Sequence, residues 1–451
     1  MKDYQKEYQQ KLCTPEEAVK VVKDGDWVDY GFALAAPKLL DRALAARADE
    51  FHEVFMRGCL IYHPMAIFEA DQRLGRPVFN WNSFFMQGQD RKLIMDGYTS
   101  FIPGHFSMFG SYYKNPECID RVDELFIQVC PMDENGNFNL GPTSAISMEV
   151  ILRAKKIVVE VNKNLPRVYG YSDDHINVAD VDAIVESDEP LDTIPNIEPT
   201  EIDHKIASLV MEHIHDGATL QLGIGGMPNA VGFMIADSDL KDIGIHTEMY
   251  VDSFMAMTKA GVVTGMKKPL NRGKQVFTFA LGSQDLYDWI DNNQVLMTAP
   301  AEYCNNGYLV STIPNFISIN NAVNMDLFGQ INAETSGPRQ ISGTGGQIDF
   351  VHGASLSPGG MSIIAMSSTH YNKKTGKEES RILPVLPEGT AITDPRSKVQ
   401  YIATEYGMVN LMGKSLWQRA EALISIAHPD LRDELIEAAE KMGMWRKSNR
   451  K

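Results

Sequence analysis

One carboxylate, Glu248, is unusual because its neighbours in the sequence are typical of a buried strand. Glu248 lies within GIHTEMYVDSF, residues 244–254, where Thr247, Met249 and Tyr250 are residue types typical of a buried strand. Burying an ionised carboxylate without a partner costs free energy. Such a group is therefore either satisfied by hydrogen bonds for structural reasons or kept for its reactivity, and position 248 is the first candidate for chemistry.

Two glycine-rich segments accompany this acid in the second half of the chain. They are QLGIGGMPNAVG, residues 221–232, and SGTGGQIDFVHG, residues 342–353. Neither has the spacing of a dinucleotide fingerprint, and neither continues into the Lys-Ser/Thr of a Walker loop. Glycine still lets backbone N–H groups converge on negative charge. Each loop is thus a candidate binding site, although a tight strand-to-helix turn would explain either one alone.

The elements that must position these residues form an internal repeat. TPEEAVKVVKDGDWVDYGF, from residue 14, contains a helix with a capping box, then Asp24-Gly25, then a strand. TEIDHKIASLVMEHIHDGATLQLGIGG, from residue 200, repeats helix, Asp-Gly and strand. The repeat predicts two related α/β halves, although one αβ unit can also resemble another by chance.

Apolar runs alternating with helical stretches indicate the fold class. FMRGCLIY (55–62), ELFIQVC (124–130) and KKIVVEVN (155–162) are typical of buried strands, and Asn135-Gly136 predicts a turn. The pattern favours an α/β protein with mostly parallel sheets. An acidic, proline-containing stretch around 185–200 indicates the connection. We expect an N-terminal domain over 1–190 and a C-terminal domain over 200–451 that carries the acid and both glycine loops.

The composition excludes several classes of function. The formal net charge of -17 argues against a nucleic-acid binder, which needs a basic face. No apolar run is long enough for a membrane span, and the polar N-terminus has no signal-peptide pattern, so we expect a cytoplasmic protein. The five cysteines are scattered without CxxC spacing, which indicates neither disulfides nor a zinc site. We predict no metal.

Four separated motifs, in order, resemble the acetyl-CoA hydrolase/transferase family, which contains the class I CoA-transferases. They are LGIGGMP, TEMYVDS, SGTGGQIDF and ALISIAHPDLRDEL, and the likeness extends to DGDWVDYG, CPMDENGNFNLGP and IVVEVN in the first half. The resemblance implies two related α/β domains of the CoA-transferase type. It also implies transfer of CoA from a short-chain acyl-CoA, with butyryl-CoA the foremost donor, to acetate.

The same resemblance implies roles for individual residues. Glu248 would be the nucleophile, passing through a mixed anhydride to a glutamyl-CoA thioester in a ping-pong reaction. Gly226 and Gly346 would supply catalytic backbone amides. CoA, as substrate and covalent intermediate rather than a permanent cofactor, would contact Gly223, Ile224, Gly225, Gly226, Met227, Gly345, Gly346, Lys374 and Lys377.

The acyl pocket is predicted from weaker signals. Asn305 and Asn306 lie where related enzymes place a side-chain amide near the acyl group. His105 lies in FIPGHFSMFGSYY (101–113), which with FNWNSFFMQG (79–88) offers aromatic walls for a short apolar chain. Aromatic residues of this kind also commonly form ordinary core, and the exposed tip of a hairpin would explain the two lysines equally well.

Several alternatives stay open. A 4-hydroxybutyrate or other short-acyl CoA-transferase would use the same site, and a hydrolase would let water intercept the intermediate. A non-catalytic CoA-binding protein would keep Glu248 only to satisfy a buried network. The expected partners are acyl-CoA and short carboxylic acids, with no nucleic acid and no membrane, and the resemblance suggests a homo-oligomer, a dimer or larger.

Overall fold

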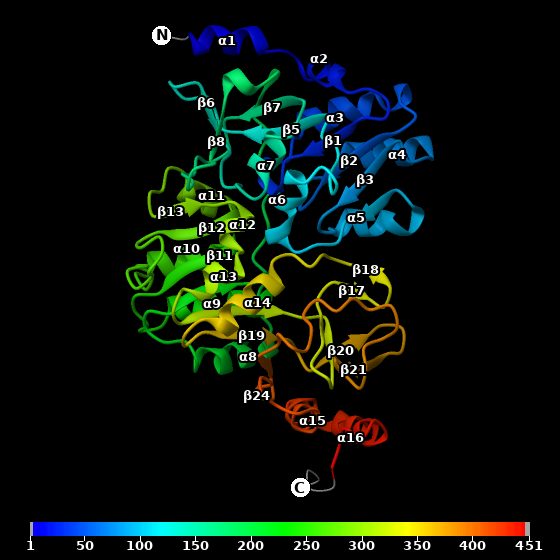
Figure 1. Ribbon diagram of the computed structural model, residues 1–451, viewed down its shortest axis with the longest axis vertical. Coiled ribbons are helices and arrows are strands. Elements are labelled where there is room, and N and C mark those ends of the chain that lie inside the picture. Colours follow the sequence, from blue (N-terminus) through cyan, green and yellow to red (C-terminus); the bar gives the residue numbers. More distant parts are fainter. Residues whose placement is uncertain (1–2, 447–451) are drawn as a thin grey trace. The chain divides into compact units, whose positions relative to one another are not determined.

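The computed structural model describes residues 3–446, which divide into two compact units (Figure 1). Among the described residues, the first unit comprises 3–195 and 276–304, and the second comprises 196–275 and 305–446. The division after residue 195 falls inside the stretch expected to connect the halves. Segment 276–304 was expected in the C-terminal domain but groups with the first unit, a long-range association that local sequence patterns do not encode.

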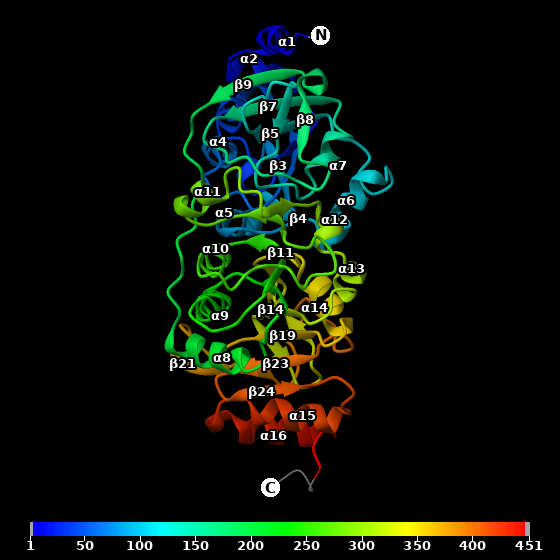
Figure 2. The same ribbon diagram turned by 90° about the vertical axis from the view of Figure 1, so that its left-hand side faces the viewer.

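The first unit is built on a seven-stranded parallel sheet in the order β4-β3-β2-β1-β5-β7-β9. Figure 2 shows α4 on one side of these strands and α6 and α7 on the other. The sheet strands are β1 Trp27–Tyr30, β2 Val54–Gly58, β3 Phe79–Ser83, β4 Thr99–Phe101, β5 Glu124–Val129, β7 Lys156–Asn162 and β9 Ala183–Ser187.

Within its described residues, the first unit also contains nine α-helices and four further strands that are not part of this sheet. The helices are α1 Tyr4–Lys11, α2 Pro15–Ala18, α3 Leu39–Ala46, α4 Ala66–Leu74, α5 Gly88–Leu93, α6 Phe106–Lys114, α7 Ser147–Ile151, α11 Gln284–Ile290 and α12 Ala301–Cys304. The remaining strands are β6 Asn137–Asn139, antiparallel to β8 His175–Asn177, together with β12 Gln275–Ala280 and β13 Leu296–Thr298.

The second unit has six sheet strands in the order β11-β10-β14-β19-β23-β24, parallel except for the last pair. Helices α9 and α10 cover one face and α13 and α14 the other (Figure 2). The strands are β10 Thr219–Leu222, β11 Gly244–Tyr250, β14 Phe316–Asn321, β19 Met361–Ala365, β23 Tyr401–Thr404 and β24 Gly407–Asn410.

The other elements of the second unit form a small subdomain and the helical layers. The helices are α8 Glu201–Met211, α9 Gly226–Ala236, α10 Asp252–Lys259, α13 Gly307–Ser311, α14 Gln347–Leu356, α15 Leu416–Ser425 and α16 Arg432–Lys441. The small strands are β15 Asn324–Asp326, β16 Ile331–Asn332, β17 Thr335–Ser336, β18 Arg339–Gln340, β20 Thr369–Asn372, β21 Lys377–Ser380 and β22 Ile382–Leu383.

The sheets explain the apolar runs of the sequence. Every residue of β5 is buried, as is every residue of β7 after its first, which is expected where helices cover both faces of a parallel sheet. The α/β class with mostly parallel sheets is therefore confirmed. No helix within residues 3–446 is both long and apolar enough to cross a membrane.

The helix, Asp-Gly, strand repeat is present in both units. Helices α2 and α8 each begin with a capping box, at Thr14 and Thr200. The glycines that follow, Gly25 and Gly217, have φ of 82° and 76°, a left-handed conformation that favours glycine. The next strand, β1 or β10, then lies inside its sheet between two parallel neighbours. The carboxyl ends of parallel strands share one edge, which is where ligands bind in open α/β sheets.

Candidate active site

Glu248 lies near the carboxyl end of strand β11. It is the only residue of that strand that is not fully buried. Although part of the residue reaches solvent, protein atoms surround its carboxyl group, and this desolvation raises the pKa of Glu248 to about 7. The negative charge of Asp349 acts in the same direction. The acid is therefore held in an environment that resists its ionised form.

Two hydrogen-bond donors meet the carboxyl group of Glu248. Asn305 Nδ2 donates to Glu248 Oε2 at 2.5 Å, and the nearby backbone N–H of Gly346 also stabilises the charged form of the carboxyl group. Both donors therefore oppose the rise in pKa. Asn305 is completely buried, and its Oδ1 has no hydrogen-bond partner in the described structure. The side-chain amide of Asn305 therefore contacts Glu248 without belonging to a larger hydrogen-bond network in the described part of the chain.

The second glycine loop approaches Glu248 so closely that position 346 admits no side chain. A Cβ at Gly346 would lie 1.9 Å from both Asn305 Nδ2 and Glu248 Oε2. The preceding Gly345 has a φ of 54°, and helix α14 begins one residue after Gly346. The glycine at position 346 therefore allows a close backbone approach to the acid.

The first glycine loop connects β10 to helix α9 at the same edge of the sheet. Strands β10 and β11 are parallel neighbours, with Thr219 opposite Gly244, so their carboxyl ends lie together. Gly225 has a φ of 119° and caps α9, which begins at Gly226. The first N–H groups of a helix lack intrahelical partners and favour an anion. Contact of 223–227 with CoA stays a prediction.

The structure separates the two neighbouring asparagines. Only Asn305 touches the acid. The side-chain oxygen of the exposed Asn306 accepts hydrogen bonds from the N–H groups of Tyr308 and Leu309, and so caps helix α13. The helix end therefore occupies the side-chain oxygen of Asn306, and a pocket role for this residue stays a prediction.

The lysines and His105 come from elements other than those that carry Glu248, Asn305 and Gly346. Lys374 and Lys377 are both exposed, at the turn and at the start of the returning strand of the β20–β21 hairpin. They are free to meet phosphate groups, and their contact with CoA stays a prediction. His105 precedes helix α6 in the first unit, at its N-cap position. Within residues 3–446, no cluster of three His, Cys, Asp or Glu side chains is arranged to hold a metal.

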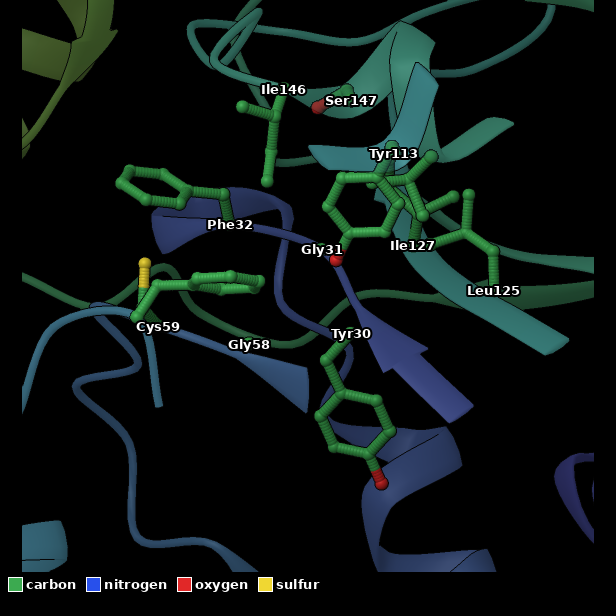
Figure 3. A pocket seen from close by; sticks show the side chains of 12 residues that line it. Tyr30, Gly31, Phe32, Gly58, Cys59, Tyr113, Leu125, Ile127, Ile146 and Ser147 are labelled. Carbon is green, nitrogen blue, oxygen red and sulfur yellow. The ribbon is translucent and has the colours of Figure 1, made fainter. Parts of the chain in front are cut away.

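An apolar cavity of about 20 Å³ lies in the first unit (Figure 3). This volume accommodates about one water molecule and not a four-carbon chain. Figure 3 shows Phe32 and Cys59 on one side and Tyr113 and Ile127 on the other, with the Tyr30 ring directed away. The lining residues are Tyr30, Gly31, Phe32, Gly58, Cys59, Phe84, Tyr113, Leu125, Ile127, Ile146, Ser147 and Val150.

The two aromatic stretches proposed as acyl walls contribute one residue each to this cavity. These are Phe84 and Tyr113. Phe79, Trp81 and Phe106 are instead buried in the core. His105 does not line the cavity. Most of these aromatics thus do what large apolar residues ordinarily do, and the acyl pocket stays a prediction.

Sequence reasoning missed one neighbour of the acid. Asp349 lies in the first turn of α14, is 8% exposed, and its charge raises the pKa of Glu248. The available signal was its place three residues after Gly346, which puts it on the same helical turn as the loop that contacts Glu248. The negative charge of Asp349 therefore disfavours the ionised form of Glu248.

Comparison with known proteins places this arrangement in a family. Residues 1–195 match the acetyl-CoA hydrolase/transferase N-terminal domain, and 282–439 match the C-terminal domain. A butyryl-CoA:acetate CoA-transferase of Anaerostipes caccae is 49% identical over 451 residues, which covers 99% of this chain and all of that protein. A 4-hydroxybutyrate coenzyme A transferase of Clostridium kluyveri is 37% identical over 97% of this chain and 99% of its own.

A solved structure agrees with the sequence matches. RipA from Yersinia pestis superposes with a TM-score of 0.89 at 35% identity, over 98% of this chain and all of that one. Both family domains, the full-length relatives and the shared fold lead to the same assignment. The chain belongs to the acetyl-CoA hydrolase/transferase family.

Proposed function

We propose that this protein is a CoA-transferase that moves CoA from a short-chain acyl-CoA to acetate, with Glu248 as the covalent carrier and butyryl-CoA as the first donor to test. The observation that carries the proposal is the carboxyl group of Glu248, which has a pKa raised to about 7 and two donors, Asn305 Nδ2 and the Gly346 N–H, directed at it. The printed names of the similar transferases support the choice of CoA transfer.

The raised pKa suits a nucleophile. A carboxylate that binds a proton more tightly is also more reactive toward a carbonyl carbon, and a pKa near the working pH leaves a useful ionised fraction. In the first step the Glu248 carboxylate attacks the thioester carbonyl of acyl-CoA. The carbon–sulfur bond breaks, CoA leaves as a thiolate, and a mixed anhydride remains on Glu248.

The two donors fit the second step. The CoA thiolate attacks the Glu248 carbonyl carbon, the anhydride bond breaks, and the free acid leaves with one oxygen that had belonged to Glu248. During this attack the negative charge develops on an oxygen of Glu248 itself. Asn305 Nδ2 already contacts this carboxyl group and the Gly346 N–H favours its charged form, so both donors would stabilise that oxyanion.

The return half-reaction repeats these steps with acetate. Acetate attacks the glutamyl-CoA carbonyl and releases the CoA thiolate. The thiolate attacks the acetyl carbonyl of the new anhydride, which forms acetyl-CoA and restores the Glu248 carboxylate. The first glycine loop, 223–227, and the lysines of the β20–β21 hairpin would hold CoA throughout. Two half-reactions that share one enzyme-bound carrier give ping-pong kinetics.

Hydrolysis at the same site is the second candidate, because the family includes hydrolases as well as transferases. Glu248 keeps some exposure to solvent, which favours this candidate. In that reaction water, and not acetate, would attack the glutamyl-CoA carbonyl.

Oxygen-18 distinguishes the two reactions and also tests the role of Glu248. The protein is incubated with butyryl-CoA and acetate labelled with oxygen-18 in ordinary water, and the peptide containing Glu248 is analysed by mass spectrometry. Transfer leaves one labelled oxygen in that carboxyl group after one turnover and can label both after several. A parallel incubation with butyryl-CoA alone should accumulate a CoA adduct on the same peptide.

The remaining outcomes decide between the alternatives. Label that enters Glu248 from oxygen-18 water and not from acetate identifies a hydrolase. An unlabelled Glu248 peptide with no adduct, in a sample that binds CoA, indicates a non-catalytic CoA-binding protein. Either result overturns the proposed transferase.

A further inference from the structure

Two buried acids lie beside the second glycine loop and take no part in the chemistry proposed above. Glu334 is 6% exposed and Asp394 is fully buried, and the negative charge of Glu334 helps to raise the pKa of Asp394. Neither forms an ion pair within residues 3–446. Buried acids without a cation are costly, so their hydrogen bonds show what they are kept for.

Glu334 holds the first part of the loop. Its backbone carbonyl accepts from the N–H groups of Ile341 and Ser342, at 2.9 and 3.2 Å. Its carboxylate accepts from Thr344 Oγ1 at 3.3 Å and from Thr393 Oγ1 at 2.9 Å. The residues that precede the two glycines are therefore tied to one buried acid.

Asp394 holds the other end of the loop. Gln347 Nε2 donates to Asp394 Oδ2 at 2.6 Å, while Asp394 Oδ1 is buried without a partner. Gln347 directly follows Gly346 and is the first residue of α14. Burial raises the pKa of Asp394 to about 7. Asp394 is thus buried in an environment that disfavours its charge. It nevertheless anchors Gln347, the residue that follows Gly346.

Between these anchors the loop has no side chains with which to hold itself. Gly345 and Gly346 lack them, and Gly346 cannot carry one because of Asn305 and Glu248. The position of the Gly346 N–H is therefore set from outside, by the residues on either side. A displacement of about 1 Å in a group that contacts the reacting atoms can cost about 100-fold in rate.

We propose that Glu334, Asp394 and Gln347 are positioning residues that hold the Gly346 N–H against the Glu248 carboxyl group. The proposal rests on the role of Glu248 in the proposed function. The acids act through the loop: Glu334 fixes its start through Thr344, and Asp394 fixes its end through Gln347.

The test compares two glutamines that make the same kind of bond in the same unit. Gln347→Leu removes the bond to Asp394. Gln330→Leu is the matched control, since Gln330 Nε2 donates to another buried acid, Asp326, through a bond of 2.7 Å to Oδ2. Single-turnover formation of the CoA adduct on Glu248 and its pH profile are measured for both variants, together with their melting temperatures.

Gln347→Leu should slow adduct formation by about 10- to 100-fold. It should also move the midpoint of the pH profile upward, because the Gly346 N–H then no longer lowers the pKa of Glu248. Gln330→Leu should change neither, even if both variants lose similar stability. The single variant Asp394→Asn keeps an oxygen that can accept from Gln347, so it should retain most of the wild-type rate.

Thr344→Val provides a second route if Gln347→Leu does not fold. It preserves shape, removes the hydroxyl that reaches Glu334, and should shift rate and pH profile in the same direction by a smaller amount. The inference is overturned if either loop variant loses stability without a shifted profile, or if Gln330→Leu behaves like Gln347→Leu. Wild-type protein that forms no adduct would overturn the proposed function itself, which separates the two failures.

Discussion

The two units place the same strand end in different chemical surroundings. In the first unit Trp27 of β1 pairs with Phe55 of β2, and in the second Thr219 of β10 pairs with Gly244 of β11. Cys59 follows Phe55 by the same number of residues as Glu248 follows Gly244. A thiol in an apolar cavity thus occupies the position that a carboxyl group with two donors occupies in the other unit.

The glycine after the central strand is also equivalent. The N–H of Gly31 donates to Phe126 O at 2.9 Å, and the N–H of Gly223 donates to Ile319 O at 2.8 Å. Beyond these glycines the chains differ, since residues 33–35 form a buried apolar 3₁₀ turn whereas Gly226 begins helix α9. The fold therefore provides a strand end beside a glycine turn in both units. The residue at that strand end decides whether the position serves core packing or catalysis.

Removing the two equivalent side chains should give the largest contrast. Glu248→Ala should lower kcat by at least about 1000-fold, because it removes the proposed covalent carrier. Cys59→Ala should change kcat by less than about threefold, as is usual for a packing residue. Steady-state exchange between butyryl-CoA and acetate measures both, with circular dichroism as the check on folding. Equal losses of kcat in the two variants would contradict the proposal that only the strand end of the second unit is catalytic.

A methyl group at Gly346 should have the next largest effect. Gly346→Ala would bring a carbon within 1.9 Å of Asn305 and Glu248, so we expect the backbone donor to move and kcat to fall by about 100- to 1000-fold. Gly88→Ala in the first unit is the control, because its new Cβ would meet nothing within 4 Å. Retained activity in Gly346→Ala would contradict the close approach.

The burial of Glu248 should be visible in the pH dependence of stability. Its pKa is about 7 in the folded protein and 4.5 as the ordinary value, so the folded state binds the proton more tightly. The stabilisation from this group is complete below about pH 4.5 and is lost as the pH rises through 7, by about 3 kcal/mol.

Glu248→Gln should remove that pH dependence. Urea unfolding of the wild type and of Glu248→Gln between pH 5 and pH 8 measures the difference, and the variant should gain stability relative to the wild type as the pH rises. A constant difference across this range would mean that the carboxyl group is not held in the environment described.

Substitution of the two neighbouring asparagines should affect different properties, the rate for Asn305 and the stability for Asn306. Asn305→Ala removes a donor to Glu248, and the pKa of Glu248 should rise. The rate at pH 7 should then fall by about 10-fold, with partial recovery at higher pH. Asn306→Ala should leave the rate unchanged and cost about 1 kcal/mol of stability through its helix cap. The pH–rate profile and thermal unfolding of both variants test this, and a reversed result would place the functional amide at 306.

The smallest effects should be equal in the two units. Thr14→Ala and Thr200→Ala each remove a capping-box hydroxyl, which accepts from the Glu17 N–H at 3.2 Å and from the Asp203 N–H at 3.1 Å. Each should cost about 1 kcal/mol, and the double variant about the sum. Thermal unfolding measures these losses. Strong non-additivity would show that the two caps are energetically coupled.

Much of the fold was predictable because its signals are local. The capping box at Thr14, the Asp-Gly pairs, the Asn135-Gly136 turn and the buried strands depend on residues close together in sequence. The grouping of 276–304 with the first unit was not predictable, because nothing within that segment specifies which sheet it joins.

The site divides in the same way. Glu248 and the glycine loops were found from residue type and spacing. The choice between Asn305 and Asn306 was not, since adjacent asparagines differ only in where the backbone directs them. The bond between Gln347 and Asp394 joins residues 47 positions apart in sequence and carries no local pattern.

The sequence by itself determined an α/β chain with a repeated helix-strand unit, two flexible glycine turns and an acid in a strand, because each depends on the intrinsic preferences of a few adjacent residues. Only the tertiary structure decided that this acid would be desolvated, contacted by Asn305 and Gly346, and flanked by anchored loop ends. A pKa near 7 arises from the burial and charges that distant segments bring together, and no residue carries that property alone.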